Sequence, residues 1–203
     1  MSAYPLTLEG TSISALIVGA GRVATRKALA LLEAGARVHV VALSGATELE
    51  HAAENDDRLT VTRAAYSSAQ IGDATLVVAA TDDPALNAAI ARDAIDRGRL
   101  VNVVDSPAAG NCTTPAVLRS GNLVVSVTAG GVPAAAKRIR DALATKLDGR
   151  YASAVADLAA LRRAMIDDGR RDRWTEASDA LVGDDFCEQV ESGTFDERVA
   201  RWR

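Results

Sequence analysis

Two features of the sequence have residue types that could do chemistry on a bound ligand. The first is a glycine turn, Gly19-Ala20-Gly21-Arg22-Val23-Ala24, with the pattern G-x-G-x-x-A. Such a turn can present backbone amides to a pyrophosphate. The second is Asp105, which directly follows the apolar run 100–104. A carboxylate there could accept a proton, or stabilise positive charge, while a substrate is oxidised.

The elements around the glycine turn predict a unit that binds a dinucleotide. An apolar strand is expected over 12–18, a helix over 22–33 and a second apolar strand over 37–42. A strand, a helix and a parallel strand in so short a segment form the βαβ unit in which this motif binds nucleotides. The residues expected to contact the cofactor are Gly19, Gly21, Arg22 and Val23.

The end of the second strand should lie beside the adenosine ribose, but it has no acidic residue. Ala42, Leu43 and Ser44 stand there, where an Asp or Glu would bind the ribose hydroxyls of NAD. No arginine cluster marks a 2′-phosphate either. Leu43 and Ser44 are therefore expected to contact the cofactor, through the Ser44 hydroxyl or backbone groups. This strand alone does not decide between NAD and NADP.

The alternation of strands and helices continues to residue 104 and predicts a parallel Rossmann-type sheet, an α/β fold. Asp82 or Asp83 can cap a helix over 84–97. Asp105 ends the last strand at the carboxyl edge of the sheet, where open α/β sheets bind ligands. The other expected elements are strands over 59–62, 76–80 and 100–104, and a short helix around His51.

The character of the chain changes near 111–115, which is where we place a domain boundary. One further strand is expected over 123–127, followed by helices over 133–147 and 151–165. The segment 167–172 is dense in charge and predicts a loop or a solvated helix end. The remainder predicts one or two short amphipathic helices.

The bulk properties of the 203 residues exclude several classes of protein. The formal net charge of −4 gives no reason to expect nucleic acid or an anionic membrane as a partner. The chain has two cysteines without C-x-x-C spacing and two histidines, so no metal site is expected. No membrane-spanning run and no signal peptide are found, so a cytoplasmic location is expected.

Several short motifs together resemble the precorrin-2 dehydrogenase part of siroheme synthases, a family that also includes sirohydrochlorin ferrochelatases. The resemblance covers about residues 12–145. Its motifs are G-x-G-x-V-A-x-R-K from Gly19 to Lys27, A-A-T-D-D from Ala79 to Asp83 with Asn87 further on, V-N-V-V-D from Val101 to Asp105, T-P-A from Thr114 to Ala116, and a strand leading to Gly130-Gly131.

The resemblance implies NAD+-dependent oxidation of precorrin-2 to sirohydrochlorin in siroheme or related tetrapyrrole biosynthesis, with Asp105 as the catalytic residue. It also implies that the backbone near Thr81 and Asp82 lines the cofactor. Family members are homodimers. The implied division is a NAD-binding Rossmann domain over 1–113, a dimerisation region over 114–147 and a helical C-terminal domain over 148–203.

The implied substrate carries many carboxylates and needs cations and polar groups to bind it. Asn102 is one candidate, although it could equally be a satisfied strand residue. Arg22, Arg26, Arg138 and Arg140 are further cations that could serve, each of which could also be an ordinary surface charge. The residues expected to bind substrate are Asn102, Arg119, Thr128, Gly130, Gly131 and Lys137.

One departure from the family pattern puts ferrochelatase activity in doubt. The family has a serine before the two glycines, whereas this chain has Ala129, which has no hydroxyl. Three alternatives to an enzyme with dehydrogenase activity alone remain open. They are a bifunctional dehydrogenase and ferrochelatase, a chelatase that has lost the redox reaction, and a non-catalytic NAD-binding redox sensor, which would have no need of Asp105.

Overall fold

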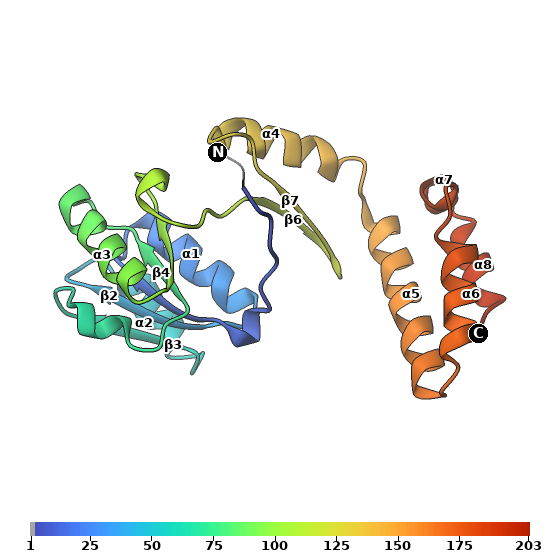
Figure 1. Ribbon diagram of the computed structural model, residues 1–203, viewed down its shortest axis with the longest axis horizontal. Helices are drawn as coiled ribbons and strands as arrows, with labels where there is room; N and C mark the ends of the chain where they lie inside the picture. Colours follow the sequence, from blue (N-terminus) through green and yellow to red (C-terminus); the bar gives the residue numbers. More distant parts are fainter. Residues whose placement is uncertain (1–2) are drawn as a thin grey trace. The chain divides into compact units, whose positions relative to one another are not determined.

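The computed structural model describes residues 3–203 (Figure 1). Its contacts group the chain into two compact units, Met1–Thr114 and Pro115–Arg203. The first unit holds the glycine turn and Asp105. The finer division of the second part at residue 147 stays a prediction.

The first unit is built on a five-stranded sheet with the order β3-β2-β1-β4-β5. All neighbouring strands are parallel, so the predicted Rossmann-type sheet is confirmed. The chain moves outward from β1 in one direction and then restarts at β4 on its other side, which creates a switch point at the carboxyl ends of β1 and β4. The strands are β1 Ser14–Val18, β2 Arg37–Ala42, β3 Leu59–Arg63, β4 Leu76–Ala79 and β5 Leu100–Val103.

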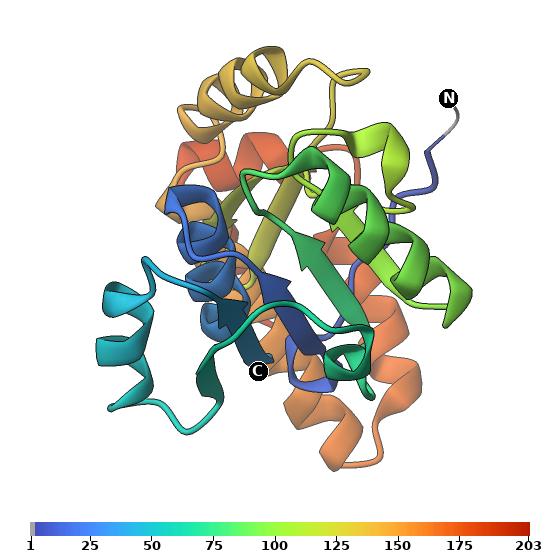
Figure 2. The ribbon, with the colours of Figure 1, turned by 90° about the vertical axis from the view of Figure 1, so that its left-hand side faces the viewer.

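Helices cover both faces of this sheet because each strand alternates its side chains between two cores. Ala15 and Ile17 of β1 pack with buried residues of α1 and α2. Leu16 and Val18 pack with buried residues of α3 on the opposite face, and Figure 2 shows α1 and α3 on either side of the strands. The helices are α1 Arg22–Glu33, α2 Thr47–Ala53 and α3 Pro84–Asp96.

The second unit begins with an antiparallel hairpin of β6 (Ala116–Ser120) and β7 (Leu123–Val127). The sequence predicted β7 but not β6, whose mixed sequence AVLRS shows no clear alternation. Helix α4 (Pro133–Ala144) follows the hairpin. It is tied to β6 by the Arg140 guanidinium, whose Nη1 donates to the Val117 carbonyl at 3.3 Å.

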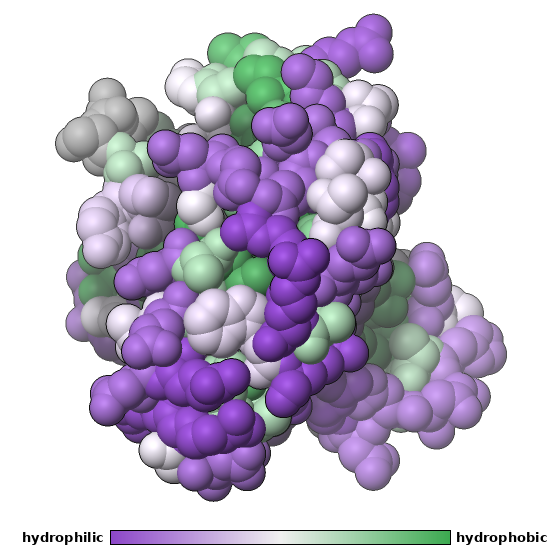
Figure 3. Space-filling model, turned by 90° about the vertical axis from the view of Figure 1, so that its right-hand side faces the viewer, coloured by the Kyte–Doolittle hydropathy of each residue, from purple (hydrophilic) through white to green (hydrophobic). Residues whose placement is uncertain are grey.

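Four further helices pack around a separate apolar core that includes Tyr151, Met165, Leu181 and Phe195. They are α5 Gly149–Asp167, α6 Arg171–Leu181, α7 Phe186–Ser192 and α8 Phe195–Ala200. Three helices therefore follow the charged segment, not the one or two that we expected. The difference arises at Gly193, which takes a φ of 77° and ends α7 just before α8 begins. The face of these helices shown in Figure 3 is mostly hydrophilic.

Among residues 3–203, no helix combines the length and the apolar character needed to cross a bilayer.

Candidate functional site

The glycine turn is packed directly against the end of β4. Gly19 takes a φ of 110°, a left-handed conformation that favours glycine. A Cβ at this position would lie 2.3 Å from the Ala80 carbonyl oxygen and 3.2 Å from the Thr81 nitrogen. The first glycine therefore allows two ends of parallel strands to touch, which brings the turn beside the segment that follows β4.

The space above Gly21 is open, as a pyrophosphate requires. Gly21 is the N-cap of α1 and has no side-chain cap, and a Cβ there would meet nothing within 4 Å. The amides of Arg22 and Val23 begin the helix, where N–H groups have no partner within the helix and carry partial positive charge. Ala24 is fully buried under this turn. The four predicted residues thus lie together in an arrangement that fits the phosphates of a dinucleotide.

The segment after β2 is exposed, and both Leu43 and Ser44 lie in it. No carboxylate follows the strand. In the sheet register, Ala42 of β2 lies opposite Arg63 of β3. The Arg63 guanidinium is occupied, because its Nε and Nη2 donate to the two carboxylate oxygens of Glu50 at 2.6 and 2.7 Å. The positive charge of Arg63, at the end of β3, is therefore already neutralised by Glu50.

A buried amide links the ends of β4 and β5. Asn87 of α3 is 1% exposed. Its Oδ1 accepts from the Thr81 backbone N–H at 3.1 Å and from the Thr81 hydroxyl at 2.8 Å. Its Nδ2 donates to the Thr81 carbonyl at 3.0 Å and to Asp105 Oδ1 at 3.2 Å. Thr81 and Asp105, both predicted site residues, are thus brought together, and the sequence had marked Asn87 only as part of a motif.

Of the two acids after β4, Asp83 is the helix cap. Its Oδ1 accepts from the backbone N–H groups of Ala85 and Leu86 at 2.8 and 3.2 Å. Pro84 occupies the first position of α3, where its missing N–H costs nothing. Asp82 remains exposed on the same turn, so its predicted contact with the cofactor is compatible with its position and stays a prediction.

Asp105 is exposed two residues after the end of β5, at the carboxyl edge of the sheet. Asn111 fixes the loop that follows, because its Oδ1 accepts from the Val101 N–H at 2.7 Å and its Nδ2 donates to the Arg99 carbonyl at 2.8 Å. Asn102 is only 5% exposed and donates to the Cys112 carbonyl at 3.2 Å. Its Oδ1 is buried and accepts no hydrogen bond within residues 3–203, so the expected contact of Asn102 with substrate stays a prediction.

Lys27 of α1 is the cation that sequence reasoning passed over. Its Nζ donates to the Thr114 hydroxyl at 2.7 Å. Burial lowers the pKa of the Lys27 ammonium, and Arg26 lowers it further, while Cys112 acts in the opposite direction. Its signal in the sequence was its position in the helix, one turn beyond the inward-facing Ala24 and Val23.

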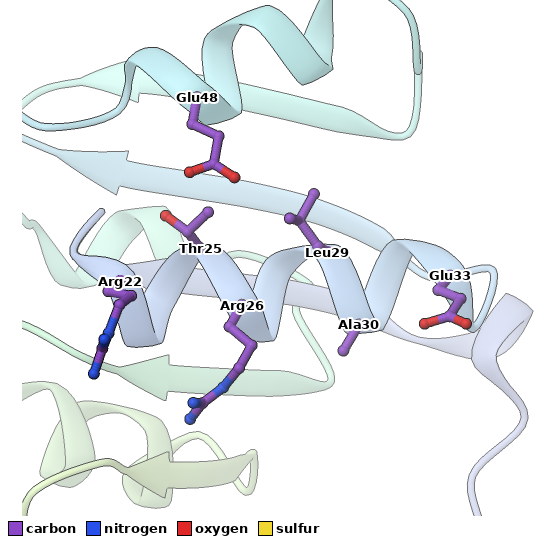
Figure 4. Close-up of a pocket in the computed structure, with 7 residues that line it drawn as sticks. All are labelled: Arg22, Thr25, Arg26, Leu29, Ala30, Glu33 and Glu48. Carbon is purple, nitrogen blue, oxygen red and sulfur yellow. The ribbon is translucent and has the colours of Figure 1, made fainter. Parts of the chain in front are cut away.

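The exposed side of α1 lines a shallow groove of about 410 Å³. Figure 4 shows Arg22 and Arg26 extending from one side of the helix, while Thr25 and Leu29 face Glu48 of α2. Glu33 lines the same groove. Because the groove mixes two cations with two acids, it is poorly matched to a polyanion. It is the beginning of α1, not this groove, that has the chemistry expected for phosphate.

The other predicted substrate residues lie in the second unit. Arg119 is exposed on β6, Thr128 is exposed just after β7, and Lys137 is exposed on α4. Gly130 and Gly131 have φ values of 54° and 85° and form the turn before α4. Their role in binding substrate stays a prediction.

A sequence-family model described as "Putative NAD(P)-binding" matches residues 6–116. The chain belongs to this family. The match spans more than half of the chain and covers the glycine turn, the Thr81 turn and Asp105. The expected dinucleotide-binding domain is thereby confirmed.

The relatives of the chain agree with the resemblance drawn from the motifs. A siroheme synthase of Chromobacterium violaceum is 37% identical over 191 residues, which are 91% of this chain and 40% of that protein. A siroheme synthase of Pseudomonas aeruginosa is 44% identical over 138 residues, 68% of this chain and 30% of that protein. The chain therefore spans less than half the length of these relatives.

A solved structure named "SirC, precorrin-2 dehydrogenase" resembles the whole chain. The match has a TM-score of 0.77 and 26% sequence identity, and it covers 98% of this chain and 100% of that one. The two proteins therefore share their fold along their full lengths, including the helices after the Rossmann sheet.

Proposed function

We propose that this protein is a dehydrogenase that oxidises precorrin-2 to sirohydrochlorin with NAD+. The observation that carries the proposal is a carboxylate, Asp105, held at the same sheet edge as the open glycine turn. Full-length similarity to a precorrin-2 dehydrogenase supports the choice of substrate. A redox sensor would have no use for an acid tied to the turn at Thr81.

The reaction removes a hydride and a proton from the tetrapyrrole. The nicotinamide of the cofactor would take the hydride. Asp105 would take the proton, and a carboxylate beside the ring would also stabilise positive charge on it before the proton leaves. Oδ1 of Asp105 accepts from Asn87. Its Oδ2 has no hydrogen bond within residues 3–203, which leaves that oxygen as the proton acceptor.

The test is to give the purified protein precorrin-2 and NAD+ under anaerobic conditions. We expect sirohydrochlorin absorbance and NADH absorbance to rise together with equal stoichiometry. Formation of neither product would overturn the proposal. Sirohydrochlorin formation that does not depend on NAD+ would contradict the role of the dinucleotide.

We further propose that iron insertion is inefficient, because Ala129 cannot supply the hydroxyl found in the family pattern. Sirohydrochlorin and ferrous iron should give siroheme no faster with the protein than without it. Ala129→Ser is the informative variant. A rate well above the spontaneous one in the unmodified protein would favour the bifunctional alternative.

A homodimer acting in the cytoplasm completes the proposal. Apolar side chains of the segment 114–147 are exposed, with Val124 at 46%, Val132 at 55% and Ile139 at 47%, which supports a contact between copies there. The free thiols of Cys112 and Cys187 suit a reducing compartment. Light scattering of the purified protein tests the dimer, and a monomer at micromolar concentration would exclude it.

A further inference from the structure

Asn87 has an unusual position among the polar side chains of the first unit. It lies in the first turn of α3 and is buried, yet every hydrogen-bonding group of its amide is used. Three of these bonds go to Thr81, and the fourth goes to Asp105. One side chain therefore touches both the turn that should line the cofactor and the proposed catalytic acid.

The chemistry of its partners fixes the orientation of this amide. Only the Oδ1 oxygen can accept from the Thr81 N–H, and only the NH₂ group can donate to the Thr81 carbonyl. The NH₂ group must then also be the one that faces Asp105, so it donates to a carboxylate oxygen. A donor in this position limits the rotation of the Asp105 carboxylate.

The contact extends to the glycine turn through the backbone. Thr81 follows Ala80, whose carbonyl oxygen would lie only 2.3 Å from a Cβ on Gly19. A displacement of Thr81 would therefore disturb the packing under the pyrophosphate turn. Asn87 therefore joins the Thr81 turn, which packs against the glycine turn, to the Asp105 carboxylate.

We propose that Asn87 is a positioning residue that holds the cofactor-binding turn and the catalytic carboxylate at one fixed spacing. This rests on the proposed function for the meaning of Asp105, but the contacts themselves do not depend on it. Starting α3 does not require the bond to Asp105, since Asp83 already caps the helix through two backbone amides. The hydrogen bond from Asn87 to Asp105 is therefore not needed to start the helix, and its role is to position the acid.

The test uses Asn87→Asp, which keeps the size and the acceptor oxygen but removes the NH₂ donor. Without the donor, the Asp105 carboxylate loses the hydrogen bond that fixes its orientation. We expect this loss to move the carboxyl carbon-13 resonance of Asp105 at neutral pH. Carbon-13 NMR of the aspartate side chains measures this directly.

The second readout is affinity for NAD+. Losing the donor to the Thr81 carbonyl should weaken NAD+ binding about fivefold, as measured by calorimetry without substrate. Asn111→Asp is the matched control, since it removes the donor to the Arg99 carbonyl and does not touch Thr81 or Asp105. In that variant both the Asp105 carboxyl resonance and the NAD+ affinity should stay as in the unmodified protein.

The proposal requires both changes in Asn87→Asp and neither in the control. Absence of either change in Asn87→Asp overturns it, because the amide would then not act on both partners. Equal changes in Asn111→Asp also overturn it, since they would show a general loosening. If Asn87→Asp does not fold, Asn87→Ser replaces it with the same expected directions. Neither readout uses precorrin-2, so failure to oxidise precorrin-2 refutes the proposed function alone.

Discussion

The guanidinium of Arg63 is bound along one edge by both carboxylate oxygens of Glu50. Nε lies 2.6 Å from Oε1 and Nη2 lies 2.7 Å from Oε2. The hydrogen bond from Arg63 holds the pKa of the Glu50 carboxyl below its ordinary value, so the pair is charged at neutral pH. Arg63 ends β3 opposite Ala42, next to the segment where the adenosine ribose should lie. Arg63 lies near the expected position of the ribose, but its pairing with Glu50 prevents it from binding another anion there.

Glu50→Gln should therefore change cofactor preference. Removing one carboxylate charge leaves the charge of the Arg63 guanidinium uncompensated at the end of β3, opposite Ala42, where it can attract a 2′-phosphate. Affinity for NADP should rise about fivefold at low salt, while affinity for NAD should stay nearly unchanged. Calorimetric titration with each dinucleotide measures both values. The thermal melting temperature should fall little, because the pair lies at the surface, with the side chains of Arg63 and Glu50 60% and 33% exposed.

Glu54→Gln is the matched control, since it removes the same charge from the C-terminal end of the same helix. Glu54 lies 3.7 Å from His51 and does not contact Arg63. An equal gain in NADP affinity for both variants would attribute the effect to net charge and refute the role of the pair.

Asp105→Asn should separate catalysis from cofactor binding. The amide is the same size but cannot accept a proton as a carboxylate does, so the rate of sirohydrochlorin formation should fall about a hundredfold or more. The dissociation constant for NAD+ should stay within about twofold, since the backbone of the glycine turn is unchanged. Stopped-flow absorbance and calorimetry measure the two quantities. Retained turnover would remove Asp105 from the mechanism.

The two glycines of the turn should fail in different ways. In Gly19→Ala the new Cβ would clash with the Ala80 carbonyl and would hold a left-handed φ, so the unfolding free energy should drop by about 2 kcal/mol or more. Gly21 has an extended φ of −69° and open space around it. Gly21→Ala should keep the melting temperature and lose NAD+ affinity. A normal melting temperature for Gly19→Ala would contradict this reading of the turn.

Most of the first unit could be predicted because its local and long-range signals agree. The α1 and β2 boundaries were predicted as observed, since Gly21 and Gly35 mark the ends of the helix and the strand is a continuous apolar run. In the second unit, β6 is short and half exposed, and it exists because β7 and α4 pack against it. Such a strand has no strong pattern of its own.

The candidate site was predictable where backbone chemistry decides and not where tertiary contacts decide. Glycine spacing located the turn that we propose binds the pyrophosphate, and the end of an apolar run located Asp105. The sequence predicted a cap at Asp82 or Asp83, and this local signal was enough to expect the cap at Asp83. The burial of Asn102 depended on the sheet face on which the fold placed it. The hydrogen bond between Asn87 and Asp105 joins residues 18 positions apart in the chain, and no local sequence pattern predicts it.

Lys27 should make the stability of the first unit depend on alkaline pH. Burial lowers its pKa in the folded state from the ordinary value of 10.5. Between the folded and unfolded pKa values of Lys27, its side chain binds more protons in the unfolded chain than in the folded one. The contribution of Lys27 to the unfolding free energy should therefore rise with pH in that window. Lys27→Met removes the titrating group, so this rise should disappear. Urea unfolding followed by circular dichroism from pH 8 to about 10.5 measures the difference. Lys146→Met, an exposed position, should leave the rise in place, and a Lys27→Met curve parallel to that of the unmodified protein would contradict the effect of burial.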